Sequence, residues 1–502
     1  MQNNKLIVML NQLNRDDLER LEAFLLLNKL KIRKQCQQLF AIVFEALKSD
    51  KKEELLDKKV VCKKLFGSDS KISSINTLCI NGIVHIKDFF AYIEYENDEN
   101  LKSYLFQKSI NKNELFELFV HQYPKDFKKL NDRKVESIGY YQANFNFQLE
   151  LLNFATKRPS IDLTKKLKKK LDLDKTDEIT SLSGIIDSFK LYSLVNKIRI
   201  ACLIANRSSS VRKTAEYDFN DVNSIKSKVN EQILKENPLI DLYYNTLLTL
   251  TGEHLKYKKV LSIIDLNKDK NFGSEISEIL VFLTNYFSNQ IKDGKVALSK
   301  IRFKIYFILY KHQVNQKLEI SVPILKNLIT LALKEKEFDL AQEIFDDNIK
   351  IIPKNERYSF KIYCTGLLAF HKSDFAETVS IIFPKWSKMN ESYKIACRLL
   401  LFKSYFELNR DRSFNSERDN FKKFVNNKRK YTKKTKHEYI NFINILNRVY
   451  NLKNMPNLEH KKLNAVRRDF AKKPIYDKFW LKEKIDELDK GNKGNKNNKL
   501  VR

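Results

Sequence analysis

The densest concentration of side chains that could contact a ligand in this 502-residue sequence is a run of cations at residues 422–436. This basic strip contains eight basic residues and no acidic one, namely Lys422, Lys423, Lys428, Arg429, Lys430, Lys433, Lys434 and Lys436. Phe421, Phe424 and Tyr431 are interleaved with them, so one interpretation is a polyanion-binding surface with a stacking platform. The alternative is that the phenylalanines belong to the core of a helix and the lysines to its solvated face and the following turn.

The whole chain carries a large positive charge, which attracts polyanions. Lys and Arg total 93 and Asp and Glu total 62, a net charge of +31, and residues 403–502 hold 28 basic and 12 acidic residues, about half of the surplus. Lysine outnumbers arginine 74 to 19. Because lysine is a point charge that holds a phosphate backbone but distinguishes bases poorly, this charge favours nonspecific over specific binding of nucleic acid. An A+T-rich coding bias would give the same lysine excess without any binding.

The short motifs of the common enzyme classes are missing from the sequence. Phosphate-binding loops need glycines two to five residues apart, and only Gly491 and Gly494 lie that close. The six cysteines are at least 17 residues apart and are predicted to be buried thiols. The segment most similar to the zinc-binding helix of a metalloprotease begins with His437 and Glu438. Its second histidine is missing, because Asn441 stands at that position. We therefore expect a non-enzymatic protein with no catalytic residue, no cofactor and no metal site.

Targeting and membrane signals are also missing. The longest apolar runs span six residues, against roughly 20 for a bilayer-spanning helix. The apolar residues 6–10 are too few for the apolar region of a signal peptide. These features predict a soluble, cytoplasmic protein with no membrane partner, and nothing indicates a small-molecule substrate.

The composition favours an all-α fold. Glycine occurs 10 times and proline 8 times in 502 residues, whereas the two together usually make up roughly 12%. Apolar residues recur at helical spacing nearly throughout, as in Leu18, Leu21 and Leu25 behind a predicted Asn14 cap. Short polar breaks separate the helical stretches, one of them at residues 207–210, and this pattern suggests antiparallel helix pairs.

A repeat is clearest between about residues 320 and 450. Ala341, Phe345 and Pro353 have the spacing of the second helix and turn of a tetratricopeptide (TPR) repeat, which this segment resembles. In this comparison Leu328 falls on the leucine of the first helix, Gly366 on the small position of the next unit, and Thr378 where Ala341 fell. The resemblance implies a TPR-like α-solenoid in which these six residues pack the repeats. Ile329, Ala332 and Ile382 depart from the family pattern.

The order of segments is also similar to that of an uncharacterised bacterial family of all-helical proteins of about 500 residues, and Leu65, Phe66 and Gly67 would form its corner. That resemblance brings no known activity. We expect an N-terminal helical cap at residues 1–95, a helical array at 96–318, TPR-like repeats at 319–452, basic C-terminal capping helices at 453–490 and a disordered polar tail at 491–502. A capping box of Thr435 and Glu438 is expected to open a helix near the end of the repeats.

The N-terminal cap allows a second interpretation. Residues 39–47, 53–66 and 71–90 are three predicted helices in the order of a helix-turn-helix unit, and the corner looks loosely like one in bacterial winged-helix activators. The groove-facing residues would be Lys71, Ser73, Ser74, Asn76 and Thr77. The candidate recognition helix contains no arginine, which weakens this interpretation.

Together these features predict a non-enzymatic helical-repeat scaffold that mediates protein–protein interaction with an unidentified protein partner. The alternative is a nucleic-acid-binding or regulatory protein that uses the basic C-terminal region or the helix-turn-helix-like unit. Salt-sensitive retention on nucleic acid would separate the two.

Overall fold

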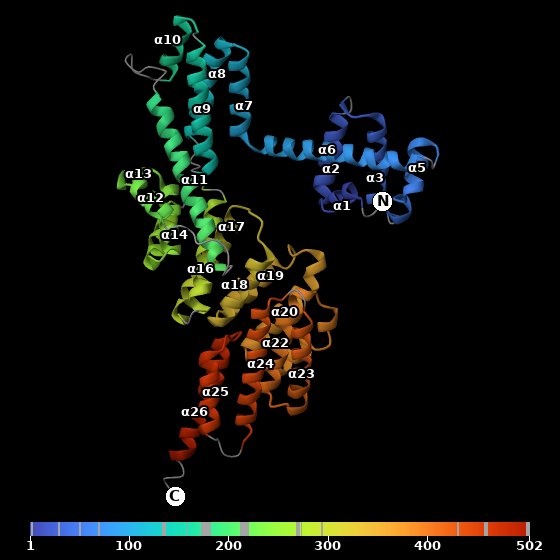
Figure 1. The fold of residues 1–502 in the computed structure, drawn as a ribbon, viewed down its shortest axis with the longest axis vertical. Coiled ribbons are helices and arrows are strands. Elements are labelled where there is room, and N and C mark those ends of the chain that lie inside the picture. Colours follow the sequence, from blue (N-terminus) through green and yellow to red (C-terminus); the bar gives the residue numbers. More distant parts are fainter. Residues whose placement is uncertain are drawn as a thin grey trace. The chain divides into compact units, whose positions relative to one another are not determined.

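A computed structural model of the chain describes residues 1, 4–28, 31–49, 52–68, 71–132, 137–157, 159–171, 182–210, 220–267, 272, 274–292, 295–428, 431–455 and 460–497. Within these residues the secondary structure consists of 26 α-helices and a few short 3-10 turns, with no strand (Figure 1). The all-α class predicted from the scarcity of glycine and proline is confirmed. None of the described helices combines the length and apolar character that a membrane crossing requires.

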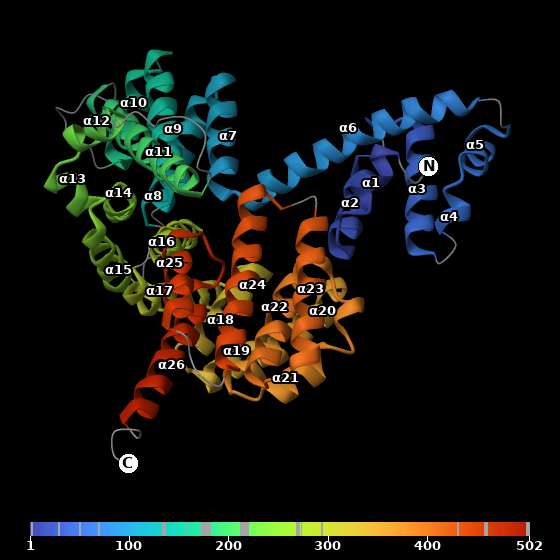
Figure 2. The ribbon, with the colours of Figure 1, turned by 60° about the horizontal axis from the view of Figure 1, so that its bottom comes forward.

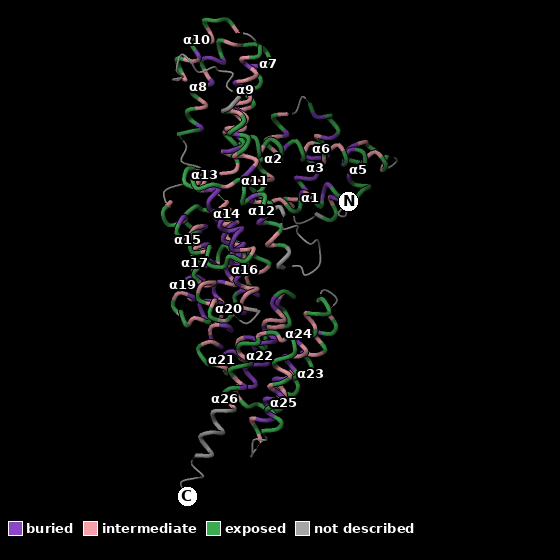
Figure 3. The backbone as a smooth tube through the Cα atoms, turned by 60° about the vertical axis from the view of Figure 1, so that its left-hand side comes forward, coloured by how far each residue is buried: buried purple, intermediate pink, exposed green. Residues whose placement is uncertain are grey.

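The chain divides into two compact units, each of which is described by itself. The first consists of residues 1–201, 218–247 and 259–273, and the second of residues 202–217, 248–258 and 274–502. Figure 3 shows that buried residues recur along the helices with exposed ones between them, as expected for helices with one apolar face.

The N-terminal helices of the first unit enclose a core of their own. They are α1 (Lys5–Leu10), α2 (Arg15–Leu27), α3 (Lys34–Lys48), α4 (Lys52–Leu55), α5 (Lys58–Phe66) and α6 (Ile72–Asn97). The Asn14 cap is confirmed, because its side chain accepts a hydrogen bond from the Asp17 amide at 2.7 Å. The single helix expected at residues 53–66 is two helices, because Asp57 caps α5 and accepts from the Lys59 amide at 2.8 Å.

A second core in the first unit is rich in aromatic residues. It is built by α7 (Glu99–Lys112), α8 (Phe116–Asp132), α9 (Ile138–Thr156) and α10 (Ile161–Lys170). The Phe119 and Phe154 rings stack with centroids 4.6 Å apart, and the Tyr123 hydroxyl donates to the Phe147 carbonyl at 3.1 Å. In α10 Leu167 is fully buried among the exposed lysines, so this helix presents a solvated basic face.

The helices that follow along the chain are α11 (Leu182–Ser210), α12 (Asn220–Lys228), α13 (Glu231–Glu236), α14 (Pro238–Leu250) and α15 (Tyr257–Leu266). The break expected at residues 207–210 is wrong, because α11 continues through Ser210. That stretch contains neither glycine nor proline, so nothing in it removes a helical hydrogen bond.

The second unit contains a continuous series of contacting helices. They are α16 (Glu275–Lys292), α17 (Ser299–Asn315), α18 (Val322–Lys334), α19 (Phe338–Asn348), α20 (Lys354–His371), α21 (Phe375–Ile382), α22 (Glu391–Glu407), α23 (Asp411–Asn427), α24 (Lys433–Lys453), α25 (His460–Lys472) and α26 (Lys478–Asn497). Each helix from α16 to α24 contacts the next one in sequence, and α18 also contacts α20, and α20 contacts α22 (Figure 2). One hydrophobic core runs from Tyr306 to Ile485.

Two expectations at the C-terminal end need correction. Helix α24 is capped by Thr432, whose hydroxyl accepts from the Thr435 amide at 3.2 Å, so the predicted box of Thr435 and Glu438 does not open this helix. The tail expected to be disordered from residue 491 is helical in part, because α26 continues to Asn497.

Candidate functional site

The residues expected to pack the repeats lie in the core of the second unit or at its rim. Leu328, Ala341, Gly366 and Thr378 are buried, Phe345 is half-buried, and Pro353 is the exposed N-cap of α20. Gly366 on α20 and Thr378 on α21 face each other, with the Thr378 hydroxyl 3.5 Å from the Gly366 carbonyl oxygen. The two helices are close enough here that a Cβ on Gly366 would lie 2.7 Å from Ile382 Cδ1.

Four turns in this unit share the same backbone conformation. One is at Lys317 between α17 and α18, with φ of 53°, and the other three follow at a regular spacing. Lys336 lies between α18 and α19, Ser373 between α20 and α21, and Asn409 between α22 and α23, with φ of 65°, 63° and 52°. In each turn the next amide donates back to a carbonyl five residues earlier, for example Asp374 to Ala369 at 2.9 Å. This is the C-terminal motif that glycine usually supplies, and the three residues are 37 and 36 positions apart (373 − 336 and 409 − 373).

A groove of about 920 Å³ is formed by α18, α20, α22 and the segment that precedes α18. Its wall includes Lys326 and Asn327 from α18, Glu356 from α20 and Tyr393 from α22. Ile351 and Pro323 add apolar surface. The groove thus combines apolar contact area with several polar groups, four of which are charged: Lys317, Glu319, Lys326 and Glu356.

Lys326 is the most unusual group in the groove. Its ammonium nitrogen lies 4.7 Å from the centroid of the Tyr363 ring and 4.9 Å from that of the Tyr393 ring. Burial lowers the pKa of Lys326 from its usual value. Among the described residues no acceptor lies within hydrogen-bond or ion-pair distance of this ammonium, so it is held by aromatic faces alone.

Other groups around Lys326 set the electrostatics of the groove. Glu356 supplies a carboxylate to the groove wall beside Lys326. One of its oxygens, Oε2, already accepts a hydrogen bond from the Tyr393 hydroxyl at 3.2 Å. Helices α18 and α20 begin at the groove with Ser321 and Pro353, and neither residue makes a side-chain capping bond. The positive ends of these helices add to the Lys326 charge, whereas Glu319 and Glu356 oppose it, so an anionic group is favoured only at the part of the groove next to Lys326.

The basic strip at residues 422–436 is only partly available for binding. Lys428 pairs with Glu391 and covers the Phe424 ring at 4.5 Å, and Lys436 donates to the Asn426 carbonyl at 2.7 Å. Lys434 lies 3.9 Å from Glu438. Lys423 and Lys433 are exposed and Lys422 is half-buried, whereas Arg429 and Lys430 lie outside the described residues.

The expected stacking platform beside the strip is wrong for Phe421. Its ring is fully buried in the core, because α23 turns this side of the helix toward α22 and α24. The Phe424 ring is covered by two cations, with the Arg398 guanidinium 5.2 Å away and the Lys428 ammonium 4.5 Å away. The interpretation of Phe421 as a core residue is therefore confirmed, and Phe424 is half-buried with two cations close to its ring.

The helix-turn-helix-like residues lie together at the start of α6. Lys71, Ser73, Asn76 and Thr77 are exposed and Ser74 is half-buried, and Gly67 ends α5 in a left-handed conformation with φ of 73°. The helix extends to Asn97 instead of ending at residue 90. Along the same exposed face the next residues are Ile80 and Val84, so the surface becomes apolar where a reading helix would need polar groups.

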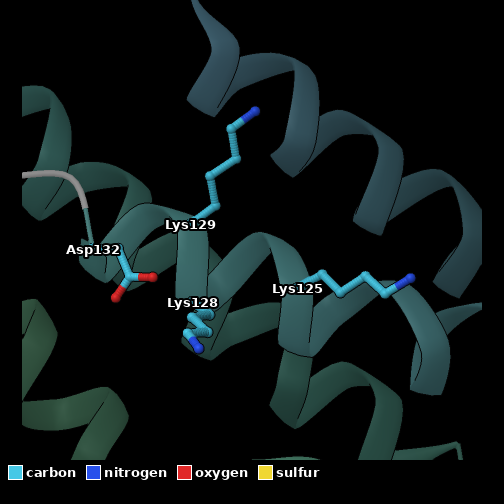
Figure 4. A pocket seen from close by; sticks show the side chains of 4 residues that line it. All are labelled: Lys125, Lys128, Lys129 and Asp132. Carbon is cyan, nitrogen blue, oxygen red and sulfur yellow. The ribbon is translucent and has the colours of Figure 1, made fainter.

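A hollow of about 490 Å³ on α8 is lined by Lys125, Lys128, Lys129 and Asp132. Figure 4 shows that Lys125, Lys128 and Lys129 extend in different directions. Because these cations do not converge on one point, the hollow has no defined ligand position.

Two buried ion pairs in the second unit have no local sequence signal. Arg398 donates to Glu417 at 2.9 Å and covers the Trp386 ring at 4.2 Å. Burial raises the pKa of Glu417 to about 7, against the opposing attraction of Arg398. Lys403 pairs with Asp477 and lies 4.7 Å from the Trp480 ring centroid. These pairs join α22 to α23 and to the segment before α26, so their role is structural.

The chemistry of thiols and metals gives no further site. Cys36, Cys62, Cys79, Cys202, Cys364 and Cys397 are all buried, as predicted. Across the described part of the chain no three His, Cys, Asp or Glu residues are grouped as metal ligands would be.

Fold and site together define an all-α protein whose second unit is a series of contacting helices with a groove lined by basic, acidic and apolar residues. No protein-family model, no curated protein and no solved structure matches the chain.

Proposed function

We propose that the chain is a non-enzymatic scaffold that binds an extended segment of a protein partner in the groove beside Lys326. The observation that carries the proposal is the Lys326 ammonium, which faces a groove of about 920 Å³ and has no anionic partner among the residues described. Lys326 is half-buried and burial lowers its pKa, so an acidic side chain or terminal carboxylate of a partner would stabilise its charged form.

The proposed architecture around the groove is a TPR-like solenoid of antiparallel helix pairs. Its support is the recurrence of one turn conformation at Lys336, Ser373 and Asn409 and the contacts between alternate helices α18, α20 and α22. In such an array the first helices of successive pairs line one continuous surface, which suits an extended ligand. The burial of all six cysteines fits a reducing compartment such as the cytoplasm.

The test uses peptides selected against the full chain from a random library, with their affinities measured by isothermal titration calorimetry. We expect the selected peptides to share an acidic residue. Lys326→Gln should weaken their binding by roughly 10- to 100-fold. This factor corresponds to the loss of one hydrogen bond to a charged group, which contributes about 1.5 to 3 kcal/mol to binding. Ser392→Trp, which places a large side chain at the exposed rim of the groove, should also weaken it.

The matched control is Lys385→Gln, which removes an exposed lysine of the same unit that does not line the groove. Its binding should equal that of the unchanged chain. Selected peptides that bind equally well to Lys326→Gln and Ser392→Trp would refute the groove as the site, and a library that yields no binder would refute the scaffold function itself.

A further inference from the structure

Helix α25 separates apolar and basic residues onto opposite faces. Leu463 and Val466 are each 1% exposed and pack into the core of the second unit. Lys461, Arg468 and Lys472 are exposed and follow one another at intervals of seven and four residues, which places them along one line of the helix. The helix therefore presents a row of three cations on the side opposite its core face.

These cations are not neutralised within the described part of the chain. The helix contains one acidic residue, Asp469, which pairs with Arg448 and, at 3.3 Å, with Lys473. Lys461, Arg468 and Lys472 have no carboxylate within ion-pair distance among the residues described. This distinguishes α25 from the basic strip, where Lys428, Lys434 and Lys436 already have partners.

The basic surface continues from α25 onto the start of α24. Asn441 donates to the Pro474 carbonyl at 3.0 Å, and the Tyr476 amide donates to the Glu438 carbonyl at 3.2 Å. The segment after α25 is thereby fixed along the first turns of α24, which begins with the exposed Lys433. Lys472 therefore lies at the end of α25 that is close to the start of α24, where Lys433 of the basic strip is exposed.

We infer that the exposed face of α25 is a contact surface for the phosphate backbone of duplex nucleic acid. From Lys461 to Lys472 the helix rises about 16 Å at 1.5 Å per residue. The same length of duplex carries roughly nine phosphate charges, so each cation of the row has phosphates within its reach. Arg468 adds a planar fork of donors that can hold two phosphate oxygens at once.

Two other anionic partners fit this surface less well. A membrane-bound helix inserts an apolar face among lipids, but Leu463 and Val466 are buried in the core and cannot be inserted. A row of cations along one line suits the high charge density of a duplex, about one charge per 1.7 Å, better than the scattered carboxylates of an acidic protein. The inference is independent of the groove, because Lys461, Arg468 and Lys472 do not line it.

The test is retention of a radiolabelled 20-base-pair duplex of mixed sequence on filters by the full chain, between about 50 and 200 mM salt. In the triple variant Lys461→Gln, Arg468→Gln and Lys472→Gln, the slope of log affinity against log salt should flatten by about 2 to 3, since each phosphate contact contributes about 0.9. The triple control Lys372→Gln, Lys385→Gln and Lys388→Gln removes equal charge from exposed positions of the same unit and should leave the slope unchanged.

Several outcomes would overturn the inference. One is that the unchanged chain retains no duplex at the lowest salt concentration. Another is that the control flattens the slope as much as the α25 variant, which would show that net charge alone is responsible. A third is that polyglutamate or anionic vesicles compete as effectively as duplex at equal charge. Arg468→Lys, which keeps the charge and the exposed position, should preserve the slope. An unchanged far-ultraviolet circular dichroism spectrum of the triple variant would show that its loss of slope is not one of folding.

Discussion

Gly366 is the position where a single added methyl group should have the largest effect on the second unit. A Cβ at this residue would lie 2.7 Å from Ile382 Cδ1 and 2.8 Å from Ile382 Cγ1. Ile382 is fully buried, so its side chain cannot swing into solvent to make room. Relief therefore requires α20 and α21 to move apart or Ile382 to leave its preferred rotamer.

The magnitude for Gly366→Ala follows from two opposing terms. Alanine is favoured over glycine inside a helix by about 1 kcal/mol. Overpacking a tight core site costs about 1 to 3 kcal/mol, and the upper part of that range applies because two atoms of a fully buried side chain are in the way. We expect a net loss of about 1 to 2 kcal/mol in the free energy of unfolding, measured by urea titration with far-ultraviolet circular dichroism.

Two further variants test the reason for this loss. Ile382→Val removes the Cδ1 atom, so the double variant with Gly366→Ala should be more stable than the sum of the two single losses predicts. Gly184→Ala is the matched control, because its new Cβ would have Gln148 Oε1 as its nearest neighbour at 3.9 Å, and it should be neutral or stabilising. If Gly366→Ala behaves like Gly184→Ala, the close approach of α20 and α21 at this point is wrong.

The other predictions concern the same unit. Ala341→Phe should lower the free energy of unfolding by about 1 to 3 kcal/mol, because Ala341 is 2% exposed in the core, and an unchanged melting temperature would refute its assigned position. Ser373→Gly should raise stability by roughly 1 kcal/mol by relieving the left-handed φ of 63°, in contrast to Ser380→Gly within α21, which should lower it. Burial, together with Lys403 and Lys334, lowers the pKa of His371 to about 4, below its unfolded value of about 6.5. The unfolded chain therefore binds the extra proton between these values, so stability should fall as the pH falls from about 6.5 to 4, and His371→Gln should make thermal unfolding less dependent on pH over this range.

Much of the fold follows from patterns that act over a few residues. Helical spacing of apolar residues, the Asn14 cap and the scarcity of glycine and proline were enough for the all-α class. The turns at Lys336, Ser373 and Asn409 could not be predicted in the same way. Their left-handed conformation is usually signalled by glycine, and here three different side chains occupy it because the hydrogen bonds of each turn involve only the backbone.

The candidate site depends on contacts between residues far apart in the sequence. Lys326 is one of 74 lysines, and it is distinguished by two tyrosines that lie 37 and 67 residues further along the chain (363 − 326 and 393 − 326). The density of charge in the basic strip is visible in the sequence, but the pairing of Lys428 with Glu391 is not. For α25 a helical projection of Leu463 and Val466 would have shown the basic face, because that face depends only on local periodicity.

The positions of the two tryptophans have a practical consequence. Trp386 and Trp480 are the two tryptophans of the chain, and both belong to the second unit, where cations lie over their rings. Intrinsic tryptophan fluorescence therefore reports on the second unit, while the first unit is spectroscopically silent at that wavelength. If the two units unfold separately, the fluorescence transition will differ from the loss of helical signal, and the chain carries its own probe for telling the units apart without a label.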